Sequence, residues 1–129
     1  MSTEQNKAVV RRFISEVLSG GNIDVIDELL APNYVNAGMG NVDREAFKGM
    51  LVGMKAAMPV REFSVGDMVA EGDVVVFRGT FNFTLADGKQ VPGRETTFYR
   101  LADGKIVEDD PLTSPDLAQI MGGAMPAPA

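Results

Sequence analysis

The chain has 129 residues, the common size of one domain, and this length suffices to bury roughly two-thirds of the surface that an unfolded chain exposes. Its 45% hydrophobic and 23% charged residues are typical of a globular protein. The absence of Cys and His excludes disulfides and argues against a tight zinc, copper or haem site. Any acid/base work therefore falls to Asp, Glu, Tyr or Lys, and we expect neither a metal nor a cofactor.

The formal charge of −6 argues against a nucleic-acid partner, because phosphate binding needs clustered Lys and Arg. The polar N-terminus MSTEQNK lacks the apolar core of a signal peptide. No apolar run approaches the roughly 20 residues that span a bilayer. We therefore expect no nucleic-acid or membrane partner, and a cytoplasmic location.

The first half of the chain has helical periodicity. Apolar residues recur at helical spacing from Glu4 to Leu18, after the capping candidates Ser2 and Thr3, and Gly20-Gly21 ends this helix. Asn22 caps a second, short helix through Leu30, which Ala31-Pro32 stops. A short extended piece follows over residues 34–36. Asp43 then caps a third helix, which Pro59 ends.

The second half alternates with the period of β-strands. Strands are predicted over Phe63–Ala70, Val74–Thr84, Gln90–Leu101 and Lys105–Leu112, separated by turns that contain Asp-Gly or Gly-Asp. The pentapeptide LADGK occurs twice, at 85–89 and 101–105, and we interpret it as the same turn used twice. A last helical turn is predicted from Ser114 or Pro115 through Met121, and the tail 122–129 is expected to be flexible.

Helices followed by a β-meander indicate one α+β domain over residues 1–129, with the helices on one face of the sheet. The three N-terminal helices should pack in the concave face of a curved antiparallel sheet. A sheet that curls around helices leaves a cavity at its open end, which is a common site for a ligand pocket. We therefore expect a small-molecule ligand.

Several stretches resemble the SnoaL-like polyketide cyclase family, in the nuclear-transport-factor-like superfamily of cone-shaped α+β folds. They are VRRFISEVLSGGNIDVIDELLAPNYV, GDVVVFRGTF, YRLADGKIVED and the ending DLAQIMGGAMPAP. The chain departs from the family's acid/base residues: 80–84 contains no His, Thr97 stands where an acidic residue is typical, and Asp109-Asp110 replaces an aromatic residue.

A partial match to the limonene epoxide hydrolases of the same superfamily adds a second template. Tyr34 and Asn36 match their Tyr and Asn two residues apart, and Arg78 matches their Arg. Of the two Asp residues that flank this Arg in those enzymes, one is Thr80 here and the other falls on Pro111, directly after Asp109-Asp110.

Side chains alternate across a strand, so parity sorts the candidates once one residue is placed. The resemblance implies that the Arg78 face of its strand lines the pocket, together with Glu95 and Thr97 on the next strand and Asp109 on the last. The phenyl rings on the other face would then cover the back of the sheet and form a homodimer interface. The predicted catalytic residues are Asp109, Arg78 and Glu95, and the predicted substrate-binding residues are Tyr34, Asn36, Thr80, Asn82, Thr97, Met54 and Met58. Phe13 and Val17 would complete the apolar walls, and the predicted interface residues are Phe77, Phe81 and Phe83.

Structural roles remain open for the same residues. Arg78 and two carboxylates can have a purely structural role as a buried ion-pair network. Tyr34 and Asn36 can likewise serve only to satisfy backbone groups. Asp109-Asp110 can be a solvated strand end, and a single β-bulge would exchange which of the two points inward.

Two functions follow from these readings. In the first, the protein is an enzyme that isomerises, cyclises or hydrates a small apolar, polyketide- or terpenoid-like substrate, with Asp109 or Glu95 as the base. Arg78 would orient the base or hold an oxyanion. In the second, it is a non-catalytic ligand-binding or accessory protein that has lost the family's catalytic residues.

Overall fold

The computed structural model describes residues 2–116 and 119–120 of the chain. The first predicted helix is present as α1 (Thr3–Arg12), which continues without a break into the π-helical segment η1 (Phe13–Ser19). The Ser2 hydroxyl accepts a hydrogen bond from the Gln5 amide at 3.1 Å, so the predicted cap is confirmed. The helix ends at Gly20-Gly21, and Gly21 has a φ of 68° that suits glycine.

The second helix is a 3-10 turn, η2 (Ile23–Val25), followed by α2 (Ile26–Leu29), and Asn22 caps it as predicted. It ends one residue early, because the next residue begins strand β1 (Leu30–Asn36). A two-residue strand, β2 (Val42–Asp43), leads into α3 (Arg44–Ala57). The Asp43 carboxylate accepts from the Ala46 amide at 2.8 Å, which confirms the predicted start of this helix.

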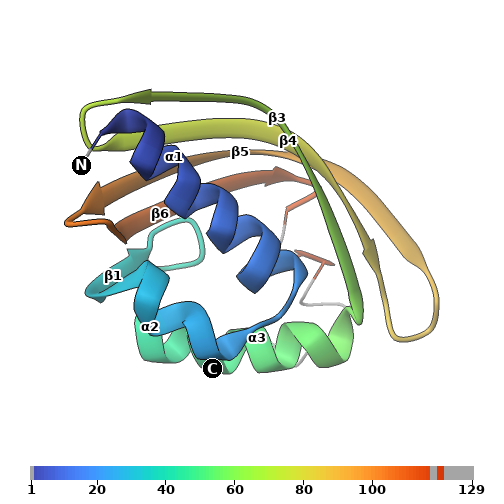
Figure 1. The fold of residues 1–129 in the computed structure, drawn as a ribbon. Helices are drawn as coiled ribbons and strands as arrows, with labels where there is room; N and C mark the ends of the chain where they lie inside the picture. Colours follow the sequence, from blue (N-terminus) through green and yellow to red (C-terminus); the bar gives the residue numbers. More distant parts are fainter. Residues whose placement is uncertain (1, 117–118, 121–129) are drawn as a thin grey trace.

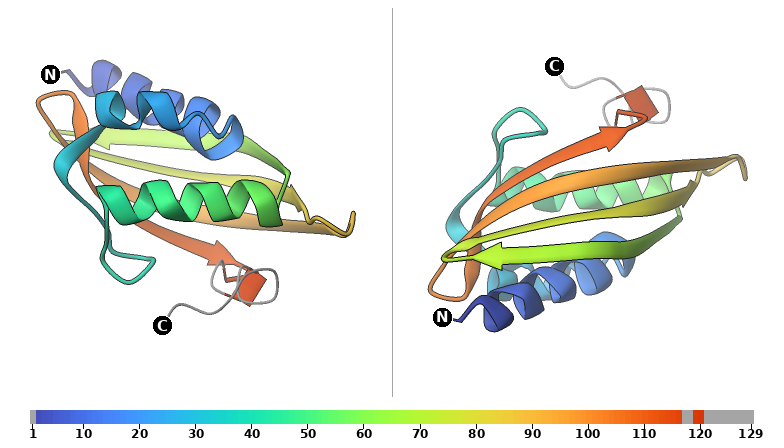
Figure 2. Two further views of the ribbon diagram at one scale, coloured as in Figure 1. Left: turned by 90° about the horizontal axis from the view of Figure 1, so that it is seen from below. Right: turned by 90° about the horizontal axis from the view of Figure 1, so that it is seen from above.

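Four long strands follow, as the alternating pattern predicts. They are β3 (Val60–Glu71), β4 (Val74–Thr84), β5 (Gln90–Ala102) and β6 (Lys105–Ser114). The sheet order is β2-β1-β6-β5-β4-β3. Figure 1 shows the long strands arching over α1 with α3 below, and both views of Figure 2 place the helices on one face of the sheet. The predicted α+β cone is confirmed.

Strand β1 corrects the prediction of a wholly antiparallel sheet. The four long strands are antiparallel to one another, but β1 pairs with β6 in parallel, with Asn36 opposite Asp109. The direction of β1 is free to differ because β1 and β6 are not joined by a hairpin, which would force them to be antiparallel.

The two LADGK pentapeptides form different turns, which corrects the expectation that one turn is used twice. The second is a tight two-residue hairpin in which Asp103 and Gly104 have φ angles of 51° and 78°. The first is a longer loop between Thr84 and Gln90, the last pair in register, and within it Gly88 has a φ of 87°. The length of each loop is set by the register of the strands it joins.

The face of β4 that points inward is the opposite of the one expected. Its phenyl rings lie inside the molecule, where Phe77 stacks on Tyr99 and Phe81 stacks on Phe83. Burial of these three rings removes far more apolar surface from water than burial of the Arg78 face would. The rings are therefore core residues of their own chain, and the prediction that they form a dimer interface is wrong.

Two clusters of buried side chains fill the space between helices and sheet. One joins α1, η1 and α3 to the strands at the Tyr99 end, and the other packs Met54 and Met58 against Phe81 and Phe83. Residues 117, 118 and 121 of the predicted C-terminal turn, and the whole tail 122–129, lie outside the described residues.

Candidate functional site

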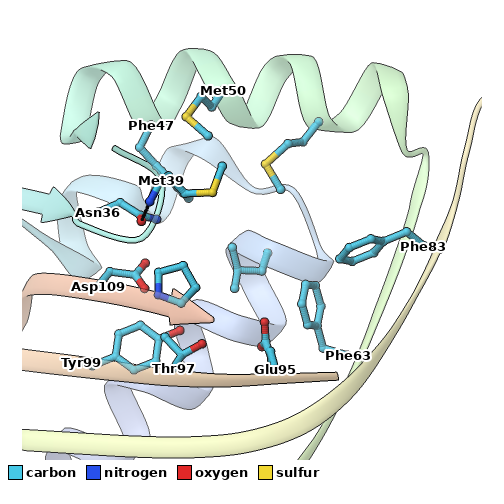
Figure 3. A pocket seen from close by; sticks show the side chains of 13 residues that line it. Asn36, Met39, Phe47, Met50, Phe63, Phe83, Glu95, Thr97, Tyr99 and Asp109 are labelled. Carbon is cyan, nitrogen blue, oxygen red and sulfur yellow. Dashed lines mark hydrogen bonds between the residues drawn. The ribbon is translucent and has the colours of Figure 1, made fainter. Parts of the chain in front are cut away.

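A small pocket lies between α3 and the inner face of strands β5 and β6 (Figure 3). Its volume is about 40 Å³, which gives room for only a few water molecules. Flexible thioethers form part of its wall, and such side chains can move aside for a larger ligand. The lining residues are Leu18, Asn36, Met39, Phe47, Met50, Met54, Phe63, Phe83, Glu95, Thr97, Tyr99, Asp109 and Pro111.

Asp109 is a buried polar group of this pocket, and its carboxyl group accepts a hydrogen bond. It lies on β6 between Asn36 of β1 and Tyr99 of β5, and it is only 4% exposed. The Tyr34 hydroxyl donates a hydrogen bond to its Oδ2 atom at 2.8 Å. Burial raises the pKa of Asp109 to about 7, a rise that the bond from Tyr34 opposes and the nearby Glu95 carboxylate enhances. Asp109 is therefore a carboxyl that can take up or release a proton near neutral pH.

Glu95 is the second carboxyl of the pocket, and it lies four residues before Tyr99 on the same face of β5. Figure 3 shows it at the end of the pocket near Phe63 and Phe83, whereas Asp109 lies at the other end. Burial alone raises its pKa to about 7. Both carboxyls predicted from the sequence thus open into one cavity.

The polar residues around Asp109 have identifiable partners. The Asn36 side-chain oxygen accepts from the Met39 amide at 3.0 Å, so Asn36 satisfies a backbone group, as the structural alternative holds, while it also lines the pocket. Tyr34 instead uses its hydroxyl on Asp109. Burial, the first cause, and the Asp109 charge both raise the pKa of Tyr34, which keeps its proton in place for this hydrogen bond. Thr97 is buried and lines the pocket between the two carboxyls.

Three residues predicted for the site lie on the outer face of β4 instead. Arg78 is 73% exposed and pairs with Asp67 of β3, with 2.8 Å between Nη2 and Oδ2. Thr80 is exposed, and the Asn82 amide faces Gln90. The prediction that Arg78 and Asp109 share one cavity is therefore wrong, because the Phe residues of β4 take the inner face. The structural alternative for Arg78 is corrected too, since its ion pair lies at the surface.

The predicted apolar walls are correct only in part. Met54 lines the pocket, while Met58, Phe13 and Val17 are buried in the core and do not line it. Asp109 is buried and Asp110 is exposed, so the solvated strand end is Asp110 alone; the register of β6 does shift, but earlier, between Ile106 and Glu108. Sequence reasoning missed Phe63 and Phe83 in the wall. The β4 parity would have found Phe83 had the apolar face of that strand been turned inward.

Comparisons with known proteins identify the family of this chain. The model of the SnoaL-like domain matches residues 10–109. The chain belongs to the SnoaL-like domain family. No curated protein matches it in sequence.

Solved structures of the same fold include proteins named for cyclase chemistry. A proposed SnoaL-like polyketide cyclase from a Jannaschia species is 26% identical, with a TM-score of 0.78 and with 98% of this chain and 95% of that chain covered. A proposed polyketide cyclase from Acidithiobacillus ferrooxidans is 25% identical, with a TM-score of 0.77 and with 97% and 100% covered. A SnoaL-like polyketide cyclase from Agrobacterium tumefaciens, at 18% identity and a TM-score of 0.76 over 95% and 100%, shows the fold alone.

Two further observations concern the described part of this SnoaL-like domain. Within residues 2–116 and 119–120, no group of three or more Asp or Glu side chains is placed to hold a metal ion. No helix in that part of the chain is long and apolar enough to cross a bilayer.

We expect Tyr34→Phe to raise the pKa of Asp109 further. The lost hydrogen bond stabilises the carboxylate more than the acid, and a bond to a charged group is worth about 1.5–3 kcal/mol, so the rise should be on the order of one pH unit. Carboxyl carbon NMR of the Asp109 resonance during a pH titration measures it. An unchanged or lowered pKa would show that the phenol does not bind the carboxylate in solution.

Proposed function

We propose that this protein is an acid/base catalyst that acts on a small apolar, polyketide- or terpenoid-like molecule. The reaction class is isomerisation, cyclisation or hydration, and the base is Asp109. The observation that carries the proposal is a buried carboxyl that opens into an apolar pocket with a pKa of about 7. A base is most effective when its pKa lies close to the working pH, and this carboxyl meets that condition.

The surroundings of Asp109 assign a role to each neighbour. Tyr34 occupies Oδ2, which leaves Oδ1 to take a proton from carbon or from water. When Asp109 accepts the proton, its negative charge passes to the substrate, so the charge buried in the pocket moves and does not disappear. Asp109 itself can return the proton that it has taken, and Glu95 lies at the far end of the pocket, where its pKa of about 7 lets it change charge in the same pH range. Thr97 lies between the two carboxyls, and Asn36 lies beside Asp109. Both side chains would position the substrate.

One observation favours the alternative of a non-catalytic ligand-binding or accessory protein. None of the described residues that line the pocket is Arg or Lys, so no fixed positive charge meets a developing oxyanion. The donors that the wall offers it are neutral: the Asn36 amide, the Thr97 and Tyr99 hydroxyls and the acid form of a carboxyl. An assay of proton transfer distinguishes the two functions.

The assay follows isomerisation of cyclohex-3-enone to its conjugated isomer by ultraviolet absorbance, since this reaction needs only a base and a returned proton. We expect the protein to accelerate it, with a rate that rises as pH increases through about 7. Asp109→Asn should lose at least about 100-fold, the usual contribution of a general base. The matched control Asp110→Asn removes the next, outward-facing carboxylate and should retain the rate.

The contrary outcomes are equally specific. A protein that binds the ketone without accelerating its isomerisation would be the accessory protein of the alternative. A rate that survives Asp109→Asn and disappears in Glu95→Gln would move the base to Glu95.

We also propose a homodimer through the outer sheet face, with an interface different from the phenyl rings first expected. That face carries apolar side chains, among them Leu112 at 75% exposure and Val69, whereas the Phe98 ring lies under the Arg100 guanidinium. Sedimentation should show a dimer at micromolar concentration and a shift toward monomer in Leu112→Asp. A wild-type monomer at high concentration would contradict it.

A cytoplasmic location stays a prediction.

A further inference from the structure

Glu95 holds a carboxyl group for which the fold supplies no partner. It is 8% exposed, and within residues 2–116 and 119–120 its carboxyl takes part in no hydrogen bond or ion pair. Figure 3 shows it pointing from β5 into the pocket, toward α3. A buried carboxylate without a donor is unfavourable, so such a group either stays protonated or meets a donor from outside the chain.

The arginines of β3 and β5 do not point to Glu95. Alternation along β5 turns Arg94 and Arg100 to the outer face, where Arg100 pairs with Asp73 and Glu108. Arg61, the buried arginine of β3, donates to three backbone carbonyls. No Lys or Arg occurs among the described residues of the pocket wall. A positive charge that reaches Glu95 must therefore belong to a ligand.

The wall near Glu95 suits an organic cation with an apolar body. Phe63 and Phe83 lie at the same end of the pocket, and Met54 of α3 lines the pocket and belongs to the same apolar cluster. Aromatic faces attract cations, and thioethers adapt to irregular apolar shapes. The formal charge of −6 further favours the approach of cations over anions.

From this combination we infer that the pocket takes a small apolar molecule bearing a protonated amine, whose ammonium group is bound by the Glu95 carboxylate. The inference builds on the proposed function in placing the ligand in that same pocket. Asp109 lies opposite Tyr99 in the sheet, and Glu95 is four residues before Tyr99 on β5. The backbone positions of the two carboxyl residues are therefore on the order of 13 Å apart. The ammonium group thus lies at one end of the ligand and the reacting carbon at the other, beside Asp109.

The direction in which amine affinity changes with pH follows from the groups that face Glu95. These are the Asp109 carboxyl of β6 and the Tyr99 hydroxyl of β5, with Tyr34 of β1 behind Asp109, and none carries a positive charge. A cation binds the ionised carboxyl, and an alkylammonium stays charged throughout the range. The ionised fraction of the Glu95 carboxyl rises from about a tenth at pH 6 to about nine-tenths at pH 8. Amine affinity should therefore rise about tenfold over this range.

The experiment compares three probes with one apolar body: isobutylamine, isobutanol and isobutyrate. Binding to the full chain is followed by the methyl resonances of labelled methionine, which report on Met39, Met50 and Met54 in the wall. We expect isobutylamine to bind at least about tenfold more tightly than isobutanol at pH 8, and isobutyrate to bind most weakly. Glu95→Gln should abolish the preference for the amine. Glu62→Gln, which removes an exposed carboxylate from β3, should preserve it.

Three results would overturn the inference: equal affinity for amine and alcohol, a preference that survives Glu95→Gln, or amine affinity that falls as pH rises. Absence of binding by all three probes would overturn it as well. The proposed function is judged separately on the same samples, because the isomerisation assay depends on Asp109 and needs no amine. A protein that fails the probe series and still isomerises the ketone would lose only the Glu95 assignment.

Discussion

The free energy of unfolding should be several kcal/mol lower at pH 8 than at pH 4. Burial raises the pKa of Asp109 from 3.8 to about 7 and that of Glu95 from 4.5 to about 7. Between the unfolded and folded pKa values, the folded protein binds more protons than the unfolded chain. Stability is therefore fully present below about pH 4 and is lost as pH rises toward 7. Each carboxyl contributes up to about 3–4 kcal/mol at roughly 1.4 kcal/mol per pH unit.

Surface carboxylates change the free energy of unfolding with pH in the opposite direction, and their effect is weak. Glu16 and Asp27 have lowered pKa values because of hydrogen bonds to Arg12 and Lys48, respectively, but all four side chains are exposed to screening by solvent. The two buried carboxyls should therefore dominate the slope between pH 5 and 7.

Urea unfolding at five pH values between 4 and 8 measures this dependence. The double variant Asp109→Asn, Glu95→Gln should flatten the curve and be more stable than the wild type at pH 8, because the amides keep the shape and cannot ionise. Asp110→Asn is the matched control, with an exposed carboxyl on the same strand, and should keep the wild-type slope. Stability that increases from pH 5 to pH 8 would show that the two carboxyls are solvated or paired in solution.

Arg61→Met should lower the free energy of unfolding by about 3–5 kcal/mol. Arg61 is 5% exposed, and its guanidinium donates to the carbonyls of Leu18, Ser19 and Met58 at 2.8, 3.1 and 2.7 Å. These carbonyls end the first helix and α3, where the last turn has no amide to satisfy them. Met keeps the apolar stem and removes every donor, so three carbonyls lose their partner at once.

The control for this variant is Arg78→Met, in the adjacent strand. Arg78 makes one exposed ion pair with Asp67, and exposed pairs contribute about 1 kcal/mol or less. Urea unfolding of the two variants should therefore differ by at least about 2 kcal/mol. A loss for Arg61→Met as small as that for Arg78→Met would mean that water replaces the guanidinium at both helix ends.

The candidate site was predictable from sequence where strand parity sufficed. On β5 the alternation that buries Tyr99 also turns Thr97 and Glu95 inward, and on β6 it separates Asp109 from Asp110. Parity failed on β4 because it tells which residues share a face and not which face is inside. The resemblance implies an inward Arg78, whereas the greater apolar area lies on the face of Phe77, Phe81 and Phe83.

By itself, the sequence determined the elements of this protein: the capped helices, the four long strands and the Asp-Gly turns. These depend on local chemistry, since caps satisfy the first amides of a helix and glycine adopts positive φ. Tertiary structure alone decided the parallel pairing of β1 with β6 and the two conformations of LADGK. It also decided the Tyr34–Asp109 hydrogen bond across 75 residues. The physical reason is that register, sheet direction and the inward face are fixed by burial against segments distant in the chain, and a local pattern does not carry that information.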